Sequence, residues 1–206
     1  MASLARRNLF QDKVRLGVTL TGIVFSVALI AVQTGLFAGF TATTSHIVDH
    51  SGADLWVSAK GLLNFDSGSP IPERRLYQVL STPGILAADK YIVQQTNWKE
   101  SDGRQETVEV VGFNPDSGIG GPWNVVEGYV RDLNATGTVF IDELFRDKLK
   151  VARLGQTVEI NGLRARVVGF PRGIRSFTTA PFVFTSFKNG RRYAGMEADK
   201  VNYIVA

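Results

Sequence analysis

His46, Asp49 and His50 are the residues whose types and spacing come nearest to a metal site. Positions 46, 49 and 50 lie on one face of a continued helix, and imidazole and carboxylate groups are ligands of zinc. The alternative is a polar cap on the apolar segment that precedes them. We favour the cap and expect no metal site, because the sequence has only two histidines and no cysteine.

Covalent and acid–base catalysis find little support in this sequence. The absence of cysteine excludes thiolate catalysis, disulfides and Cys-based metal sites. No GxSxG motif is present, and neither histidine sits in a strand–turn–helix nucleophile context. Asp142 and Glu143 are adjacent, so they point to different faces and are typical of the start of a helix. We therefore expect no catalytic residue and no enzyme.

Two further groups of residues invite a ligand-binding interpretation. Gly118-Ile119-Gly120-Gly121 suggests a phosphate loop, but it lacks the lysine and the spacing of the known motifs, and no helix pattern follows. We predict a structural loop and no cofactor. Trp56, Trp98 and Trp123 are expected to anchor a core or an interface instead of forming a ligand cage.

The formal net charge of +4 raises the question of nucleic acid. The densest basic cluster is interleaved with Gly and Phe and matches no nucleic-acid motif; it comprises Arg172–Arg175, Lys188, Arg191 and Arg192. We expect no nucleic-acid partner and interpret the cluster as a surface facing solvent or lipid headgroups.

A long uncharged segment dominates the start of the chain. No charged residue occurs from Leu16 to Ser45, and Leu16–Phe40 is predominantly apolar. About 20 helical residues cross the hydrocarbon core of a bilayer, and Thr and Ser hydroxyls can bond to carbonyls within the helix. We predict a transmembrane helix at residues 16–45. A cleaved signal peptide and a buried core helix are the alternatives, but a signal peptide needs a shorter apolar stretch.

Charges before this segment predict its orientation. Asp12 is the one acid among four basic residues, Arg6, Arg7, Lys13 and Arg15. Short segments rich in Lys and Arg stay in the cytoplasm, and Leu4–Val14 is amphipathic. We therefore predict a cytoplasmic interfacial helix at 1–15 and an extracytoplasmic core domain at 46–206, with the chain in the inner (plasma) membrane.

The patterns after residue 46 predict more strands than helices, without regular alternation. Helices are expected at 72–81, starting at Pro72 and burying Leu76, Val79 and Leu80, and at 143–150, burying Leu144, Phe145 and Leu149. Strands are expected at 53–58, 88–100, 105–113, 136–142, 157–160, 163–170, 181–185 and 201–205. These elements predict an α+β fold with mainly antiparallel pairing.

Two hairpins are the clearest local signals. Asp102-Gly103 is a tight-turn sequence between 88–100 and 105–113. Asn161-Gly162 tolerates the positive φ angles of a type I′ turn. A two-residue turn pairs Ile160 with Leu163, Glu159 with Arg164, Val158 with Ala165 and Thr157 with Arg166. Apolar pairs then share one face, which supports this register.

The layout resembles that of the MacB/FtsX-type ABC transporter permeases, over almost the whole chain. The start carries Leu4-Ala5-Arg6-Arg7-Asn8-Leu9, then Asp12-Lys13-Val14-Arg15, then Leu16-Gly17-Val18. The later part carries Val139-Phe140-Ile141-Asp142, Leu154-Gly155-Gln156-Thr157-Val158-Glu159-Ile160-Asn161-Gly162 and Val167-Val168-Gly169-Phe170, which are similar to the family's periplasmic core domain. Gly118–Val125 is most similar to the DevC branch of exporters.

The resemblance implies a permease that dimerises and pairs with a separate cytoplasmic ABC ATPase and a periplasmic membrane-fusion adaptor protein. It also implies that the outer domain moves with the ATPase cycle and that this subunit carries no catalytic residue. Family members continue into three further transmembrane helices, which this sequence does not contain, so we expect part of a permease. A single-pass, membrane-anchored periplasmic binding or regulatory module of FtsX-like signalling type is the main alternative, and an anchored enzyme is a third.

Overall fold

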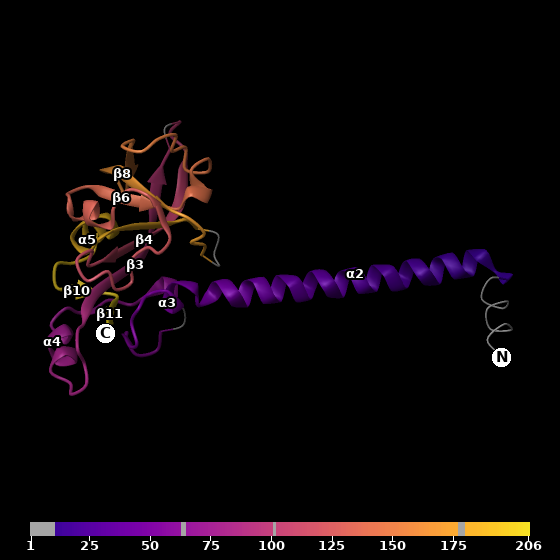
Figure 1. The fold of residues 1–206 in the computed structure, drawn as a ribbon, viewed down its shortest axis with the longest axis horizontal. Helices are drawn as coiled ribbons and strands as arrows, with labels where there is room; N and C mark the ends of the chain where they lie inside the picture. The colour runs from indigo at the N-terminus through magenta and orange to yellow at the C-terminus, as the bar shows by residue number, and fades with distance from the viewer. Residues whose placement is uncertain (1–10, 63–64, 101, 177–179) are drawn as a thin grey trace. The chain divides into compact units, whose positions relative to one another are not determined.

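The computed structural model of this protein describes residues 11–62, 65–100, 102–176 and 180–206 (Figure 1). The chain divides into two compact units, one ending at Thr43 and one spanning Thr44–Ala206. The first unit contains the long helix α2 (Lys13–Thr44), except for the last residue of that helix, Thr44. The second is referred to below as the β-rich unit.

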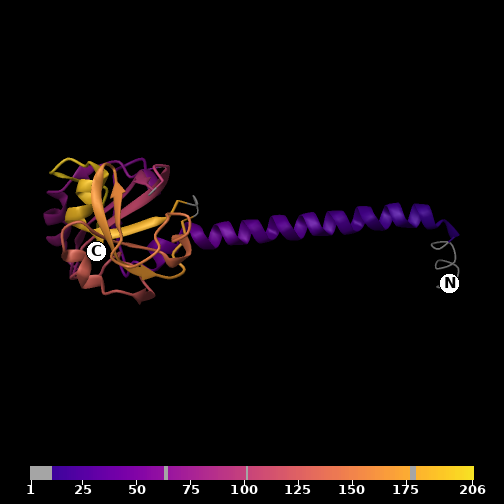
Figure 2. The same ribbon diagram turned by 90° about the horizontal axis from the view of Figure 1, so that it is seen from above.

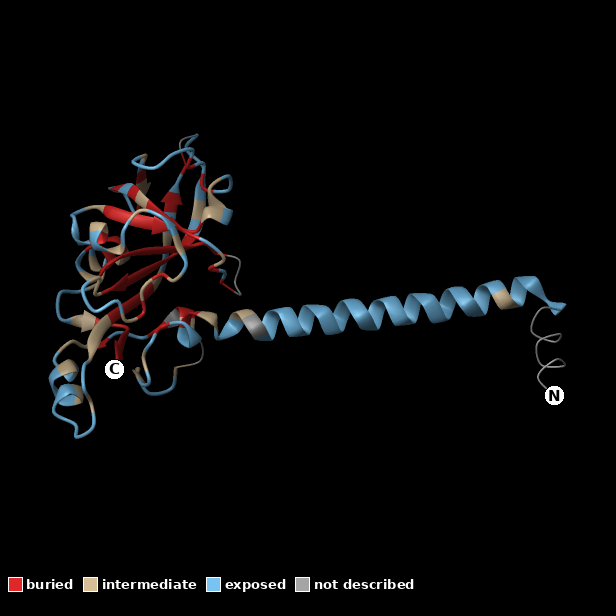
Figure 3. Cartoon of the chain, viewed as in Figure 1, coloured by how far each residue is buried: buried red, intermediate tan, exposed pale blue. Residues whose placement is uncertain are grey.

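Helix α2 has the features of a membrane-spanning segment. Asp12 caps the N-terminus of α2, since its carboxylate accepts a 3.0 Å hydrogen bond from the Arg15 backbone N–H. Residues 13–41 are long and apolar enough to cross a bilayer, and the helix is exposed along most of its length (Figure 3). Hydroxyl groups donate to carbonyls four residues earlier at 2.8–2.9 Å, as expected, from Thr19, Thr21, Ser26 and Thr41. The interfacial helix predicted for Leu4–Val14 falls largely on residues 1–10, outside the described residues.

The β-rich unit is built from short helices and eleven described strands (Figures 1 and 2). The strands are β1 (Trp56–Val57), β2 (Ile71–Pro72), β3 (Asp89–Lys99), β4 (Gln105–Phe113), β5 (Val125–Glu127), β6 (Thr138–Ile141), β7 (Thr157–Ile160), β8 (Leu163–Pro171), β9 (Phe182–Ser186), β10 (Lys200–Val201) and β11 (Tyr203–Val205). The α-helices are α3 (His46–Asp49), α4 (Arg75–Leu80) and α5 (Phe187–Ala194); η1 (Phe65–Ser67), η2 (Val130–Asn134) and η3 (Glu143–Phe145) are 3₁₀ turns.

Six of the described strands close a ring of hydrogen-bonded pairs, in the order β3, β4, β9, β6, β8, β7 and back to β3. Strand β11 pairs with the start of β3 and with β1, while β5 pairs with β8. The β4–β9 and β6–β8 pairs are parallel, and the other described pairs are antiparallel. The α+β class with mainly antiparallel pairing is therefore confirmed.

Strand β4 is buried on both faces, because it separates two hydrophobic clusters. Val108 and Val110 belong to the cluster that contains Trp98. Val111 and Phe113 belong to the second cluster, on the opposite face of the strand. The buried residues accordingly concentrate on the strands of the β-rich unit (Figure 3).

The predicted Asn-Gly hairpin is present as strands β7 and β8. Its four residue pairs are those expected from a two-residue turn, from Ile160–Leu163 to Thr157–Arg166. Asn161 and Gly162 have φ angles of 49° and 75°, as a type I′ turn requires. The Asp102-Gly103 hairpin is also present, joining β3 to β4.

Several predicted elements are shorter than expected or different in kind. Pro72 does not start a helix, because it lies in β2 opposite Lys200, and α4 begins only at Arg75. Leu76 and Val79 of α4 are partly buried, but Leu80 is 43% exposed. The predicted strand 53–58 shrinks to β1, since the N–H groups of Asp54 and Leu55 both bond to the carbonyl of Ala206.

The helix predicted at 143–150 is also wrong. Only the 3₁₀ turn η3 forms, and further turns follow it. The Arg146 side chain donates to the carbonyls of Val151 and Ala152, which holds the chain in a tight loop instead of a helix. Leu149 is buried as expected, whereas Leu144 is 49% exposed.

Candidate functional site

The segment that follows α2 forms an aromatic cluster with a distant loop. The His50 ring stacks on Trp123 with centroids 4.4 Å apart, and His46 meets the His50 and Trp123 rings edge-on at 4.5 and 5.1 Å. We call these three residues the junction cluster. Asp49 instead accepts a 2.6 Å hydrogen bond from the Ser45 hydroxyl. The described part of the chain holds no group of three or more His, Asp or Glu side chains placed to bind a metal ion.

Partial burial of His46 favours its neutral form. Desolvation lowers the pKa of His46, the neighbouring His50 lowers it further, and Asp49 partly opposes both. A histidine whose folded-state pKa is depressed contributes full stability above its unfolded value, near 6.5, and less as the pH falls below it. The contribution of His46 to stability is therefore greatest at neutral or alkaline pH.

Two further contacts fix the start of the β-rich unit to its core. Ile47 of α3 is only 4% exposed and belongs to the same hydrophobic cluster as Phe113. The carbonyl of Ser51 accepts a 2.7 Å hydrogen bond from the Gly120 N–H, and the Gly120 carbonyl accepts one of 3.0 Å from the hydroxyl of Tyr91. Tyr91 is completely buried on β3. The chain that follows α2 is thus connected to strand β3 through the 118–121 loop.

The glycine run Gly118–Gly121 therefore has a structural role, as predicted. Gly120 has a φ angle of +72°, and a Cβ atom placed on it would lie 2.2 Å from the Tyr91 ring. Only glycine fits a positive φ angle with a ring this close.

The last residue of the chain is joined to the same segment. The Asp54 and Leu55 N–H groups donate to the Ala206 carbonyl at 2.8 and 2.9 Å, and the Ala206 N–H donates to the Leu55 carbonyl at 3.0 Å. Strand β1 continues this pairing with β11, which in turn pairs with β3. Residues 46–57, which we call the junction segment, are consequently fixed by side-chain packing, by a loop and by a β-ladder.

The structure also contains a buried acid pair that was not predicted. Glu109 of β4 is completely buried beside Asp66 of η1, and its carboxyl also faces the side chains of Ser176 and Gln95. Desolvation, followed by the charge of Asp66, raises the pKa of Glu109 to about 8, and desolvation also raises the pKa of Asp66. Val111 and Phe113 share the face of Glu109, so their apolar character was the available signal that this face is buried.

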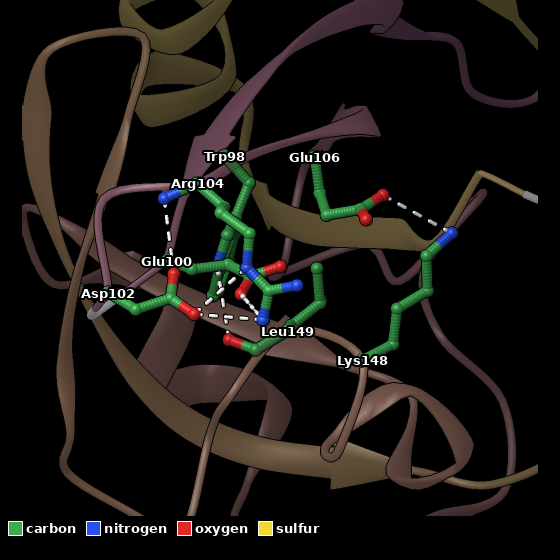
Figure 4. A network of polar contacts seen from close by, with 7 residues as sticks. All are labelled: Trp98, Glu100, Asp102, Arg104, Glu106, Lys148 and Leu149. Carbon is green, nitrogen blue, oxygen red and sulfur yellow. Dashed lines mark hydrogen bonds and ion pairs between the residues drawn. The ribbon is translucent and has the colours of Figure 1, made fainter.

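The tip of the β3–β4 hairpin carries a network of ion pairs centred on Arg104 (Figure 4). Arg104 contacts Asp102 at 2.8 Å and Glu100 at 3.4 Å. In the same region, the indole N–H of Trp98 donates to the carbonyl of Leu149 at 3.3 Å (Figure 4). Trp98 is fully buried and so anchors the core, as expected. The Arg104–Asp102 pair is exposed and contributes little to stability, whereas the side chain of Glu100 is only 3% exposed.

The remaining residues singled out in the sequence lie apart from the junction cluster. Asp142 is buried and accepts hydrogen bonds from the Leu144 and Ile174 N–H groups at 2.9 and 2.5 Å, so it holds two loops together. Glu143 pairs instead with Arg172, at 2.6 Å. Two members of the predicted basic cluster have different acidic partners, since Arg191 pairs with Glu73 and Arg172 with Glu143. Trp56 packs against Phe65, Tyr91 and Tyr203.

Comparison with known proteins adds an independent line of evidence. Residues 16–206 match the family described as the MacB-like periplasmic core domain. An uncharacterized ABC transporter permease of Mycobacterium tuberculosis strain H37Rv is 32% identical over 197 residues, covering 94% of this chain and 53% of the relative. Another, from Mycobacterium bovis, is 28% identical over 166 residues, covering 80% of this chain and 44% of the relative. The chain spans about half the length of these relatives.

Among solved structures, one supports this fold and a second is similar to part of the chain. The extracellular domain of the noncanonic ABC-type transporter YknZ from Gram-positive bacteria superimposes with a TM-score of 0.50 at 14% identity, covering 74% of this chain and 80% of that one. The periplasmic region of MacB from Actinobacillus actinomycetemcomitans gives a TM-score of 0.49 at 13% identity, covering 66% of this chain and 63% of that one.

Proposed function

This chain belongs to the MacB-like periplasmic core domain family of ABC transporter permeases, and we propose that it serves in an export system of the DevC or MacB kind. In this proposal a separate cytoplasmic ATPase hydrolyses ATP, and the β-rich unit moves in response. The N-terminus is cytoplasmic, α2 crosses the inner membrane, and the β-rich unit lies in the periplasm.

The junction segment is the observation that carries this proposal. A displacement of α2 can be transmitted to the β-rich unit only if the connecting chain is not a flexible linker. Ile47, the junction cluster and the Ser51–Gly120 hydrogen bond hold the chain from His46 onward on the core of the β-rich unit. Pairing of Leu55 with Ala206 joins both ends of the unit at the same place.

The partners follow from the same proposal. The relatives are about twice as long as this chain, and their additional length can hold the further membrane helices and the ATPase-contacting loop that the family resemblance implies. The β-rich unit would meet a periplasmic membrane-fusion adaptor protein, and two permease copies would form a homodimer. This subunit would contribute no catalytic residue to ATP hydrolysis.

Co-purification tests the proposal directly. A full-length permease that contains this chain, extracted in mild detergent, should retain its cognate ATPase in a fixed stoichiometry. Recovery of a periplasmic protein on the β-rich unit without any ATPase would contradict it. That result would favour the alternative, a membrane-anchored binding or regulatory module.

A further inference from the structure

The segment 74–88, which we call the α4 arm, projects from the β-rich unit between β2 and β3. Leu76 and Val79 of α4 pack on the small cluster formed by Ile71, Val201 and Ile204. The chain then reverses at Pro83-Gly84, where the Ile85 N–H bonds to the Thr82 carbonyl and Gly84 has a φ angle of +94°. One side of the arm is therefore fixed to the unit.

The other side of the α4 arm presents apolar side chains to solvent. Tyr77 is 72% exposed, Leu80 is 43% exposed and Leu86 is completely exposed. Arg74, Tyr77 and Leu80 recur at three-residue spacing, so they lie on one face of the helical turn. Clustered exposed leucine and tyrosine are typical of a surface that docks on something.

Charge on the α4 arm favours an anionic, interfacial partner. Arg74 and Arg75 are exposed, and no acidic residue occurs from 74 to 88. Within the described residues, neither arginine forms an ion pair. The preceding acid, Glu73, is already paired with Lys90 and Arg191. Arginine beside exposed leucine and tyrosine is the composition that binds phosphate-bearing lipid surfaces.

The α4 arm also lies at the end of the β-rich unit where the chain arrives from α2. Val205 of β11 pairs with Trp56 of β1 on one side and with Asp89 of β3 on the other. Asp89 directly follows the arm, and Trp56 belongs to the junction segment. The tip of the β3–β4 hairpin, at Asp102, lies beyond the opposite end of β3.

From these observations we propose that the α4 arm docks on the outer surface of the bilayer. Tyr77, Leu80 and Leu86 enter the interfacial region, and Arg74 and Arg75 contact the phosphates of anionic lipid headgroups. The inference rests on α2 crossing the bilayer, as in the proposed function, but it does not depend on an ATPase.

A single cysteine can report on this contact, because the chain contains none. The full chain carrying Leu86→Cys is labelled with an environment-sensitive fluorophore and reconstituted in nanodiscs containing phosphatidylglycerol and spin-labelled lipid. Co-elution of the chain with the nanodisc shows that α2 is inserted. The matched control carries Asp102→Cys, at the other end of β3. The spin-labelled lipid should quench the label at position 86 at least about twofold more than the label at 102.

A charge-reversed variant separates lipid binding from simple proximity. Arg74→Glu combined with Arg75→Glu should reduce quenching at position 86 while leaving the tryptophan emission of the folded chain unchanged. Equal quenching at positions 86 and 102 would overturn the proposal. A label at 86 that is shielded from aqueous iodide but not reached by the spin-labelled lipid would also overturn it, because a protein would then cover the arm.

Discussion

Replacing Glu109 by glutamine should stabilise the β-rich unit at alkaline pH and have almost no effect at pH 4. Wild-type Glu109 is fully buried, and burial next to Asp66 raises its pKa to about 8. The unfolded chain ionises this group near pH 4.3, so the folded state loses stability as the pH rises from there to about 8. Glutamine has no proton to lose, and Glu109→Gln should gain on the order of 2–4 kcal/mol over wild type at pH 8.

Intrinsic fluorescence can measure this difference on the full chain in detergent. All three tryptophans, Trp56, Trp98 and Trp123, lie in the β-rich unit, so their emission follows its unfolding. Glu106→Gln is the matched control, because Glu106 is on the same strand in a partly exposed ion pair with Lys148. It should change stability by less than about 1 kcal/mol at any pH. A Glu109→Gln variant that is less stable than wild type at pH 8 would refute the buried-acid interpretation.

Alanine at position 120 should destabilise the β-rich unit by about 3 kcal/mol or more. Two effects combine, since Gly120 has a positive φ angle and a Cβ atom there would lie 2.2 Å from the buried ring of Tyr91. Relief of this clash moves the loop and weakens the Ser51–Gly120 hydrogen bond. Hydrogen exchange in the junction segment, residues 46–57, should therefore become faster than in wild type.

Gly118 provides the matched control for this substitution. Its φ angle is +76°, close to that of Gly120, but a Cβ atom at 118 would have nothing within 4 Å. Gly118→Ala should therefore cost only the conformational strain, about 1 kcal/mol, and leave exchange in the junction segment unchanged. Equal destabilisation by the two variants would show that the Tyr91 contact does not hold this loop.

Local signals in the sequence predicted the elements whose geometry is set by neighbouring residues. The four residue pairs of the β7–β8 hairpin were predicted correctly, because Asn161-Gly162 adopts the positive φ angles that fix a two-residue turn. The long uncharged segment predicted helix α2 equally clearly. The parallel β4–β9 and β6–β8 pairs were not predictable, because pairing partners far apart in sequence leave no local pattern.

Helix α5 was missed although the sequence contains its boundaries. Ser186 caps its start and Gly195, with a φ angle of +62°, ends it. The interior obscured this signal, because Gly190 is a poor helix former. The structure explains the glycine: a Cβ atom on Gly190 would lie 2.8 Å from the Cα atom of Gly112, so α5 packs directly on the backbone of β4.

The junction cluster was only partly predictable, because one of its three members lies far from the other two in the sequence. The sequence placed His46, Asp49 and His50 together, and a polar cap was the favoured interpretation. Trp123 completes the junction cluster from a loop more than seventy residues away. The environment of Glu109 likewise depends on η1 bringing Asp66 beside it, which the alternation of the strand alone does not specify.

The most direct test of the central claim is to measure whether the β-rich unit moves when the ATPase turns over. A donor fluorophore at Asp102→Cys, in the full-length permease with its ATPase in nanodiscs, reports energy transfer to acceptor-labelled lipid headgroups. The coupling account predicts different transfer efficiencies in the nucleotide-free and ATP-trapped states, and a smaller difference in Gly120→Ala than in Gly118→Ala. Identical efficiencies in both nucleotide states of an actively hydrolysing complex would contradict it.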